Sequence, residues 1–141
     1  MNINKIKYLR ELKGYTQNDI ANKIGVSRGT YGGWEVKNDN IPLIKFNKVC
    51  NILNTSMDYI SDIETEYIEI KSKDINFDLL PKRLKETRVL HNDKEKETAK
   101  ILGIDRTTYS KYETGTNIIQ TEYLIMFAKH YKVSVDWLCG R

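Results

Sequence analysis

The sequence predicts an all-α protein built from two copies of one small helical unit. The first observation is an internal repeat: Gly-Val-Ser-Arg-Gly-Thr-Tyr, residues 25–31, aligns with Gly-Ile-Asp-Arg-Thr-Thr-Tyr, residues 103–109. The second is that apolar residues recur at helical spacing in both halves. The third is length, because 141 residues accommodate two units of about 60 residues each.

The repeat extends over most of both halves. At the same offset, residues 34–35 match 112–113 and residues 55–60 match 133–138. Upstream of Ala21, which falls on Ala99, the best match slips by three positions and pairs Leu9 with Leu84. This slip predicts a three-residue insertion in the second copy, at His91-Asn92-Asp93.

The pattern predicts five short helices in each unit. Residues suited to start a helix are Thr16, Ser27, Pro42 and Ser56 in the first unit and Pro81, Asp105 and Ser134 in the second. Gly25 and Gly103 supply tight turns between the second and third helices, where a positive φ is expected. The third helices are expected at 27–34 and 105–113.

Charge divides the chain into three segments. Residues 1–62 hold nine Lys/Arg and six Asp/Glu (+3), residues 63–77 hold two and four (−2), and residues 78–141 hold twelve and nine (+3). We therefore expect a first domain over 1–62, an acidic linker over 63–77 and a second domain over 78–141. Residues 66–71 alternate polar and apolar side chains, so the short linker is either extended, which we favour, or a strand that pairs with its counterpart in a second chain.

Composition narrows the class of protein. A net charge of +4 and a pI near 8.9 are compatible with nucleic-acid binding. No apolar run approaches a membrane span and no secretory signal is evident, so we expect a cytoplasmic protein. Cys50 and Cys139 lack metal or redox spacing, and we expect two half-buried thiols; His91 and His130 have no ligand partner nearby in sequence. Without any catalytic, nucleotide or zinc motif, we expect no enzyme, no cofactor and no metal.

Both halves carry the motifs of one family. In the first copy these are Leu9-Arg10, Thr16-Gln17, Ala21, Gly25-Val26-Ser27 and Trp34-Glu35. In the second they are Leu84, Ala99, Gly103-Ile104, Tyr109, Tyr112-Glu113, Gly115 and residues 134–138, Ser-Val-Asp-Trp-Leu. Each half thereby resembles the lambda-repressor-like, or Cro-type, helix-turn-helix family, also called the XRE family. The resemblance implies two tandem five-helix domains and double-stranded DNA as partner, and it leaves a homodimer open.

The resemblance also implies site residues. The family places its third helix in the major groove, while the N-terminus of its second helix contacts the DNA backbone. Phosphate contacts are expected from Gln17 in the first copy and from Lys94 and Lys96 in the second. Base-facing positions are Ser27, Arg28, Gly29 and Gly33 in the first copy and Asp105, Arg106, Thr107 and Lys111 in the second. A bracing salt bridge is expected between Arg10 and Glu35, with Lys85 and Glu113 as its second version.

The two copies depart from the family pattern in different places. Residues 27–34 contain three glycines, which read no base and cost about 1 kcal/mol each relative to alanine. The second copy has Lys94-Glu95 where the first has Thr16-Gln17, and a carboxylate repels phosphate, although neighbouring lysines offset this. We expect the second copy to be the main base reader, with Arg106 and Lys111 foremost.

Two functions are consistent with these features. The first is a sequence-specific DNA-binding regulator of transcription, expected to be a repressor, that reads DNA with its third helices. The second is a protein-interaction module, an antirepressor or an oligomerisation adaptor, that keeps the fold and has lost DNA reading. Four aromatic residues interleaved with basic ones suit single-stranded bases, but their spacing favours the core: Tyr31, Trp34, Tyr109 and Tyr112. Met57 and Trp137 are expected in the core or at an interface.

Overall fold

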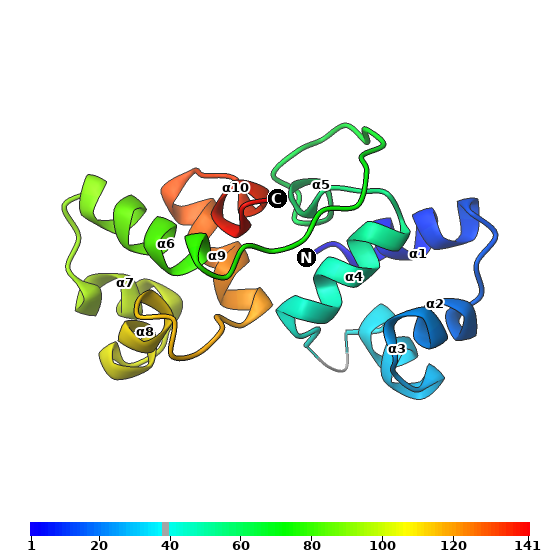
Figure 1. Ribbon diagram of the computed structural model, residues 1–141, viewed down its shortest axis with the longest axis horizontal. Coiled ribbons are helices and arrows are strands. Elements are labelled where there is room, and N and C mark those ends of the chain that lie inside the picture. Colours follow the sequence, from blue (N-terminus) through cyan, green and yellow to red (C-terminus); the bar gives the residue numbers. More distant parts are fainter. Residues whose placement is uncertain (38–39) are drawn as a thin grey trace. The chain divides into compact units, whose positions relative to one another are not determined.

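The computed structural model describes residues 1–37 and 40–141, and within these ranges it contains ten α-helices and no strand (Figure 1). The chain divides into two compact units, Met1–Lys73 and Asp74–Arg141, with five helices in each. The prediction of an all-α chain with two five-helix units is confirmed. None of the described helices combines the length and apolarity needed to cross a bilayer.

The helices of the two units follow one plan. Those of the first unit are α1 (Ile3–Leu12), α2 (Gln17–Ile24), α3 (Arg28–Glu35), α4 (Leu43–Ile52) and α5 (Met57–Ile60). Those of the second are α6 (Leu79–Leu90), α7 (Glu95–Leu102), α8 (Arg106–Glu113), α9 (Thr121–Tyr131) and α10 (Val135–Cys139). One constant offset in residue number relates the starts of α2 to α5 to those of α7 to α10, so a single register relates the two copies.

The loop between the first two helices shows that the predicted insertion is wrong. Gly14 follows α1 with φ 76°, and Asn92, at the same offset, follows α6 with φ 58°. Asparagine is the residue that best replaces glycine in this left-handed conformation. The residues His91-Asn92-Asp93 are therefore the equivalents of residues 13–15 and add nothing to the loop.

The three-residue slip arose from a change of residue type in the core. Leu84, fully buried, occupies the place of Ile6, which is also buried. Thr87 is buried in the place of Leu9 and donates its hydroxyl to the Arg83 carbonyl at 2.7 Å. The apolar residue that best matches Leu9 in the sequence is therefore Leu84, which lies one turn before the true equivalent, Thr87.

Most of the helices have an N-terminal cap formed by a side chain, as predicted. The Thr16 hydroxyl accepts from the Asp19 N–H at 3.1 Å, and the Asp19 carboxylate accepts from the Thr16 N–H at 2.8 Å, which completes a capping box. Ser27, Ser56, Asp105 and Ser134 cap α3, α5, α8 and α10. The two prolines differ from prediction: Pro42 precedes α4, and Pro81 is the third residue of α6. Both positions suit proline, because a first-turn N–H has no intrahelical acceptor.

Each unit buries its own apolar core. The four aromatic residues assigned to the core are at most 5% exposed: Tyr31, Trp34, Tyr109 and Tyr112. Met57 is also fully buried, whereas Trp137 is 38% exposed, with the Arg83 guanidinium 4.7 Å from its ring centroid. Trp137 is therefore not a core residue. Cys50 and Cys139 are fully buried rather than half-buried.

The segment predicted as a linker packs largely on the first unit. Ile70 donates its N–H to the Asn54 carbonyl at 3.0 Å, and the Asn54 amide donates back to the Ile70 carbonyl at 3.3 Å. The Tyr67 hydroxyl also donates to the Asn54 carbonyl, at 3.3 Å. Residues 66–71 are thus extended without strand pairing in the described structure, and the first unit ends at Lys73.

Candidate nucleic-acid interface

A buried ion pair fixes the third helix of the first unit against the first helix. Arg10 donates from Nε to Oε1 of Glu35 at 2.6 Å and from Nη2 to Oε2 at 3.1 Å. Its remaining Nη1 donates to the Tyr15 carbonyl at 2.8 Å. Burial by itself raises the pKa of Glu35, but hydrogen bonds from Arg10 and Gln17 hold it below its ordinary value. The predicted Arg10–Glu35 pair is confirmed.

The second unit has the same brace with a different cation from the one predicted. Arg88 donates from Nε to Oε1 of Glu113 at 2.6 Å, from Nη2 to Oε2 at 3.0 Å and from Nη1 to the Asp93 carbonyl at 2.9 Å. Lys85, the predicted partner, is exposed. Arg88 is the equivalent of Arg10 in the common register, and only a planar guanidinium can bond both carboxylate oxygens side by side. The error has the same origin as the three-residue slip.

The turn between α2 and α3 sets the third helix on the surface. Gly25 ends α2 with φ 74°, and the following N–H, of Val26, donates to the Ala21 carbonyl at 3.0 Å. Gly103 ends α7 with φ 72° in the second unit. A residue with a Cβ is strained in this conformation. The predicted use of both glycines is confirmed, and the turn leaves one face of α3 and of α8 exposed to solvent.

The third helices, α3 and α8, are the ones expected to read bases, and we call them the reading helices. The first of them, α3, presents little beyond one long side chain. Arg28 and Gly29 are exposed, and so is Thr30. The Ser27 hydroxyl is occupied by the helix cap, since it accepts from the Thr30 N–H at 3.1 Å and donates to the Thr30 hydroxyl at 2.9 Å. Thr30 was not among the residues predicted from the sequence, although a polar residue three positions after a cap is a usual partner of that cap.

Gln17 lies at the start of α2 and joins the brace. Its Nε2 donates to Oε2 of Glu35 at 2.9 Å. A Cβ added to Gly32 would lie only 3.2 Å from Oε1 of Gln17. Gly32 therefore makes room for the Gln17 side chain, so this glycine has a packing role in addition to its cost to the helix.

The second reading helix, α8, carries more functional groups. Arg106, Thr107 and Lys111 are all exposed on it. Asp105 is occupied as the cap: Oδ1 accepts from the Thr108 N–H at 2.8 Å and Oδ2 from the Thr108 hydroxyl at 2.9 Å. These hydrogen bonds lower the pKa of Asp105. The helix thus exposes two cations and one threonine to solvent.

The start of α7 differs from that of α2. Lys94 occupies the cap position, but an ammonium has no acceptor, so only half of the capping box forms: Glu97 accepts from the Lys94 N–H at 3.1 Å. The Lys94 and Lys96 side chains are exposed, as a phosphate contact requires. Glu95 makes an ion pair with Arg106, Oε2 to Nη1, at 3.5 Å. This pair was not predicted, because its members lie on two helices separated by a turn.

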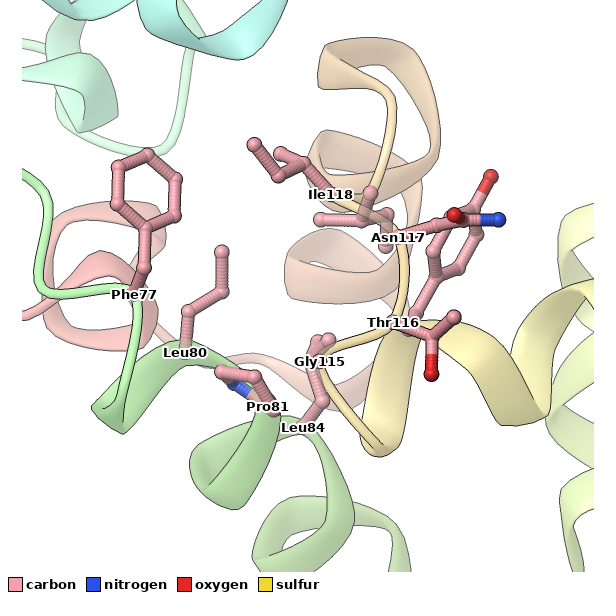
Figure 2. A pocket seen from close by; sticks show the side chains of 10 residues that line it. Phe77, Leu80, Pro81, Leu84, Gly115, Thr116, Asn117 and Ile118 are labelled. Carbon is pink, nitrogen blue, oxygen red and sulfur yellow. The ribbon is translucent and has the colours of Figure 1, made fainter.

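A pocket in the second unit is lined by none of the candidate DNA-contacting residues (Figure 2). Its lining is uncharged and consists of Phe77, Leu80, Pro81, Leu84, Tyr112 and residues 115–119. Phe77 and Ile118 stand on opposite sides of the pocket in Figure 2 and are 43% and 47% exposed. Such an uncharged lining offers no cation to a phosphate group. In residues 1–37 and 40–141, no three His, Cys, Asp or Glu side chains gather as metal ligands.

Comparisons with known proteins match both halves. A helix-turn-helix family model matches residues 6–60 and again residues 84–138, two segments related by the same offset as the helices. The chain is 36% identical over 62 residues to the cryptic phage CTXphi transcriptional repressor RstR of Vibrio cholerae, which is 44% of this chain and 55% of the repressor. It is 37% identical over 54 residues to the antitoxin HipB of Escherichia coli, 38% of this chain and 61% of HipB.

A third relative is the uncharacterized HTH-type transcriptional regulator YobD of Bacillus subtilis. Identity is 32% over 56 residues, which cover 40% of this chain and 50% of YobD. The chain thus spans between half and three-fifths of the length of these three curated relatives. No solved structure gives a significant match.

Proposed function

The chain belongs to the XRE-type, lambda-repressor-like helix-turn-helix family of DNA-binding regulators and carries that fold twice. On this basis we propose that it is a sequence-specific regulator of transcription that binds double-stranded DNA, most simply as a repressor. The observation that carries the proposal is the pair of solvent-exposed third helices, each held by a buried arginine–glutamate brace. The likeness to a protein named as a transcriptional repressor supports the same direction.

The groups at the start of the second helices fit contacts to the DNA backbone. The Gln17 amide gives one N–H to Glu35, and its second N–H is then the donor for a phosphate oxygen. In the second unit, the exposed Lys94 and Lys96 take the role of contacting phosphate. Such contacts set the position of the protein on the duplex and carry no base information.

We assign most of the base reading to the second copy. Arg106 and Lys111 suit guanine O6 and N7, and the Thr107 methyl suits the thymine methyl group. In the first copy the Ser27 hydroxyl caps α3 through its hydrogen bonds to Thr30. Base reading by the first copy therefore depends chiefly on Arg28. This division is a proposal about side-chain chemistry at equivalent positions.

One observation favours a second candidate function. The uncharged pocket between Phe77 and Ile118 leaves both side chains exposed and is suited to a protein partner or a second copy of this chain. A protein-interaction module, acting as an antirepressor or an oligomerisation adaptor, would bind its partner protein through this pocket and would not bind DNA. We rank it second, because it leaves the exposed cations of α8 without a role.

The test is selection of bound sequences from a pool of random duplexes, followed by affinity measurements at several salt concentrations. A DNA-binding regulator enriches one motif and loses affinity steeply as salt rises, with a slope set by the number of phosphate contacts. If both units read bases, the selected duplexes contain two half-sites, and if one unit does, they contain one half-site. Absence of binding to any duplex at low salt rejects the proposal in favour of the interaction module.

A further inference from the structure

We propose that Glu95 regulates base reading by the second copy: its carboxylate holds Arg106 in the unbound protein, and Arg106 must leave it to reach a base. Glu95 would then lower the affinity of the second copy and make its reading conditional on the sequence that it meets. This inference rests on the DNA-binding function proposed above.

The pair joins the two elements that are expected to meet DNA. Glu95 is the first residue of α7, and the start of this helix is expected to contact the DNA backbone. Arg106 is the first residue of the reading helix α8. Their side chains are 26% and 65% exposed, and the contact is a single one of 3.5 Å from Nη1 to Oε2. A single, exposed and long ion pair is weak, so a ligand can displace it.

A change of one residue type explains why Glu95 turns to Arg106. In the first copy, Gln17 at this position donates an N–H to Glu35. A carboxylate has no such donor, and the equivalent acceptor, Glu113, carries a like charge. Glu113 also already accepts from Arg88 and from the Tyr109 hydroxyl, the latter at 2.8 Å. Glu95 thus makes no hydrogen bond to the brace, although its charge acts on Arg88, and it forms its ion pair with Arg106.

Competition, rather than support, follows from where the charge would lie. When Arg106 moves onto a base edge, Glu95 loses its ion pair at a helix start that is expected to approach the DNA backbone. Its charge is then repelled by the phosphates. A base that bonds Arg106 well offsets this cost and another base does not, so Glu95 should sharpen discrimination while it lowers affinity.

The variant that isolates this effect is Glu95→Gln, which gives the second copy the residue of the first. With the tightest duplex recovered from the random pool, Glu95→Gln should bind about fivefold more tightly than the unmodified chain. Arg106→Ala should cost about threefold more affinity in the Glu95→Gln background than in the unmodified chain, because Arg106 then has no ion pair to lose. The matched control is Glu86→Gln, the same charge change at an exposed position of α6, which should alter affinity less than twofold.

The outcomes separate the inference from the function beneath it. If the effects of Glu95→Gln and Arg106→Ala are additive, Glu95 only repels DNA, and the holding role is refuted. Weaker or unchanged binding by Glu95→Gln also refutes it, since Glu95 would then support Arg106 on the base or do nothing. If no protein, the unmodified chain included, binds any duplex, the DNA-binding function itself fails. Thermal unfolding of each variant confirms that both side chains can be changed in a folded protein.

Discussion

The cores of the two units use different chemistry on one backbone plan. In the first unit the apolar Ile20 and Leu53 are fully buried. In the second unit their places are taken by Thr98 and Tyr131. The Tyr131 hydroxyl donates to Oδ2 of Asp93 at 2.7 Å and accepts from the Thr98 hydroxyl at 2.7 Å. The fold therefore tolerates polar groups in the core where each one has a hydrogen-bond partner.

The surfaces of the reading helices differ as much as the cores. The first copy has a neutral glutamine at the start of α2 and glycines around Arg28. The second has the cations Arg106 and Lys111, together with a carboxylate, Glu95, that pairs with one of them. What the two copies share is the brace, the turn glycine and the caps. Those features maintain the fold, while the residues expected at DNA have diverged.

The largest expected effect comes from breaking the brace. Arg10→Ala and Arg88→Ala should each lower the free energy of unfolding of their own unit by about 3–5 kcal/mol, because each leaves a buried carboxylate without its cation. Lys85→Ala, the control, should change it by less than about 0.5 kcal/mol, since Lys85 is exposed. Chemical denaturation followed by circular dichroism measures all three. A loss with Lys85→Ala as large as that with Arg88→Ala would contradict the register described above.

The local features of the chain could be predicted from its sequence, whereas the contacts between helices could not. Thr16, Ser27 and Asp105 were identifiable as caps because a cap depends on residues within three positions. The brace of the second unit was misassigned, because Thr87 in place of Leu9 removed the apolar signal that sets the register. The Glu95–Arg106 pair depends on the crossing of α7 and α8 and has no short-range signature.

The second expected effect concerns base discrimination by the two reading helices. Arg106→Ala and Lys111→Ala should each reduce the preference for the selected duplex by about 1–3 kcal/mol, the usual worth of a good contact to a base edge. Arg28→Ala should reduce it less. Affinities for the selected duplex and for single-base variants of it give the comparison. Equal losses from all three variants would show that both copies read bases alike.

A change at Gln17 provides the contrast to those variants. Gln17→Ala should weaken binding to every duplex by a similar factor, because a phosphate contact carries no sequence information. The same set of duplexes serves for this measurement. A loss confined to the selected duplex would instead assign Gln17 to base reading.

The polar core of the second unit gives a smaller and pH-dependent effect. Burial, together with Asp93, raises the pKa of Tyr131 from 10.0 to about 12. Between these pH values the hydroxyl ionises in the unfolded chain but not in the folded one, so its contribution to stability is full below pH 10 and is lost as pH rises through 12. Tyr131→Phe should cost about 1–2 kcal/mol at neutral pH.

The pH dependence of that variant is the decisive part. Unfolding of the unmodified chain and of Tyr131→Phe should be measured at neutral pH and between pH 10 and 12, where the difference between them should shrink as pH rises. Effects of pH that do not involve the Tyr131 hydroxyl are common to both proteins and cancel from the comparison. A difference that stays constant over this range would mean that the Tyr131 hydroxyl has the same pKa in the folded and unfolded chain.

The smallest expected effect tests whether the glycines of the first reading helix are defects or serve packing. A Cβ at Gly29 would meet only the Ser27 hydroxyl, at 4.0 Å, so Gly29→Ala should stabilise the first unit by about 0.5–1 kcal/mol through helix propensity. Gly32→Ala gains the same propensity but presses on Gln17 at 3.2 Å and displaces it from Glu35, which offsets the gain. Gly29→Ala should therefore raise the melting temperature, whereas Gly32→Ala should leave it nearly unchanged and weaken DNA binding as Gln17→Ala does. If both substitutions stabilise equally and leave binding intact, Gly32 has no packing role, and the first copy has simply lost the side chains of a reader.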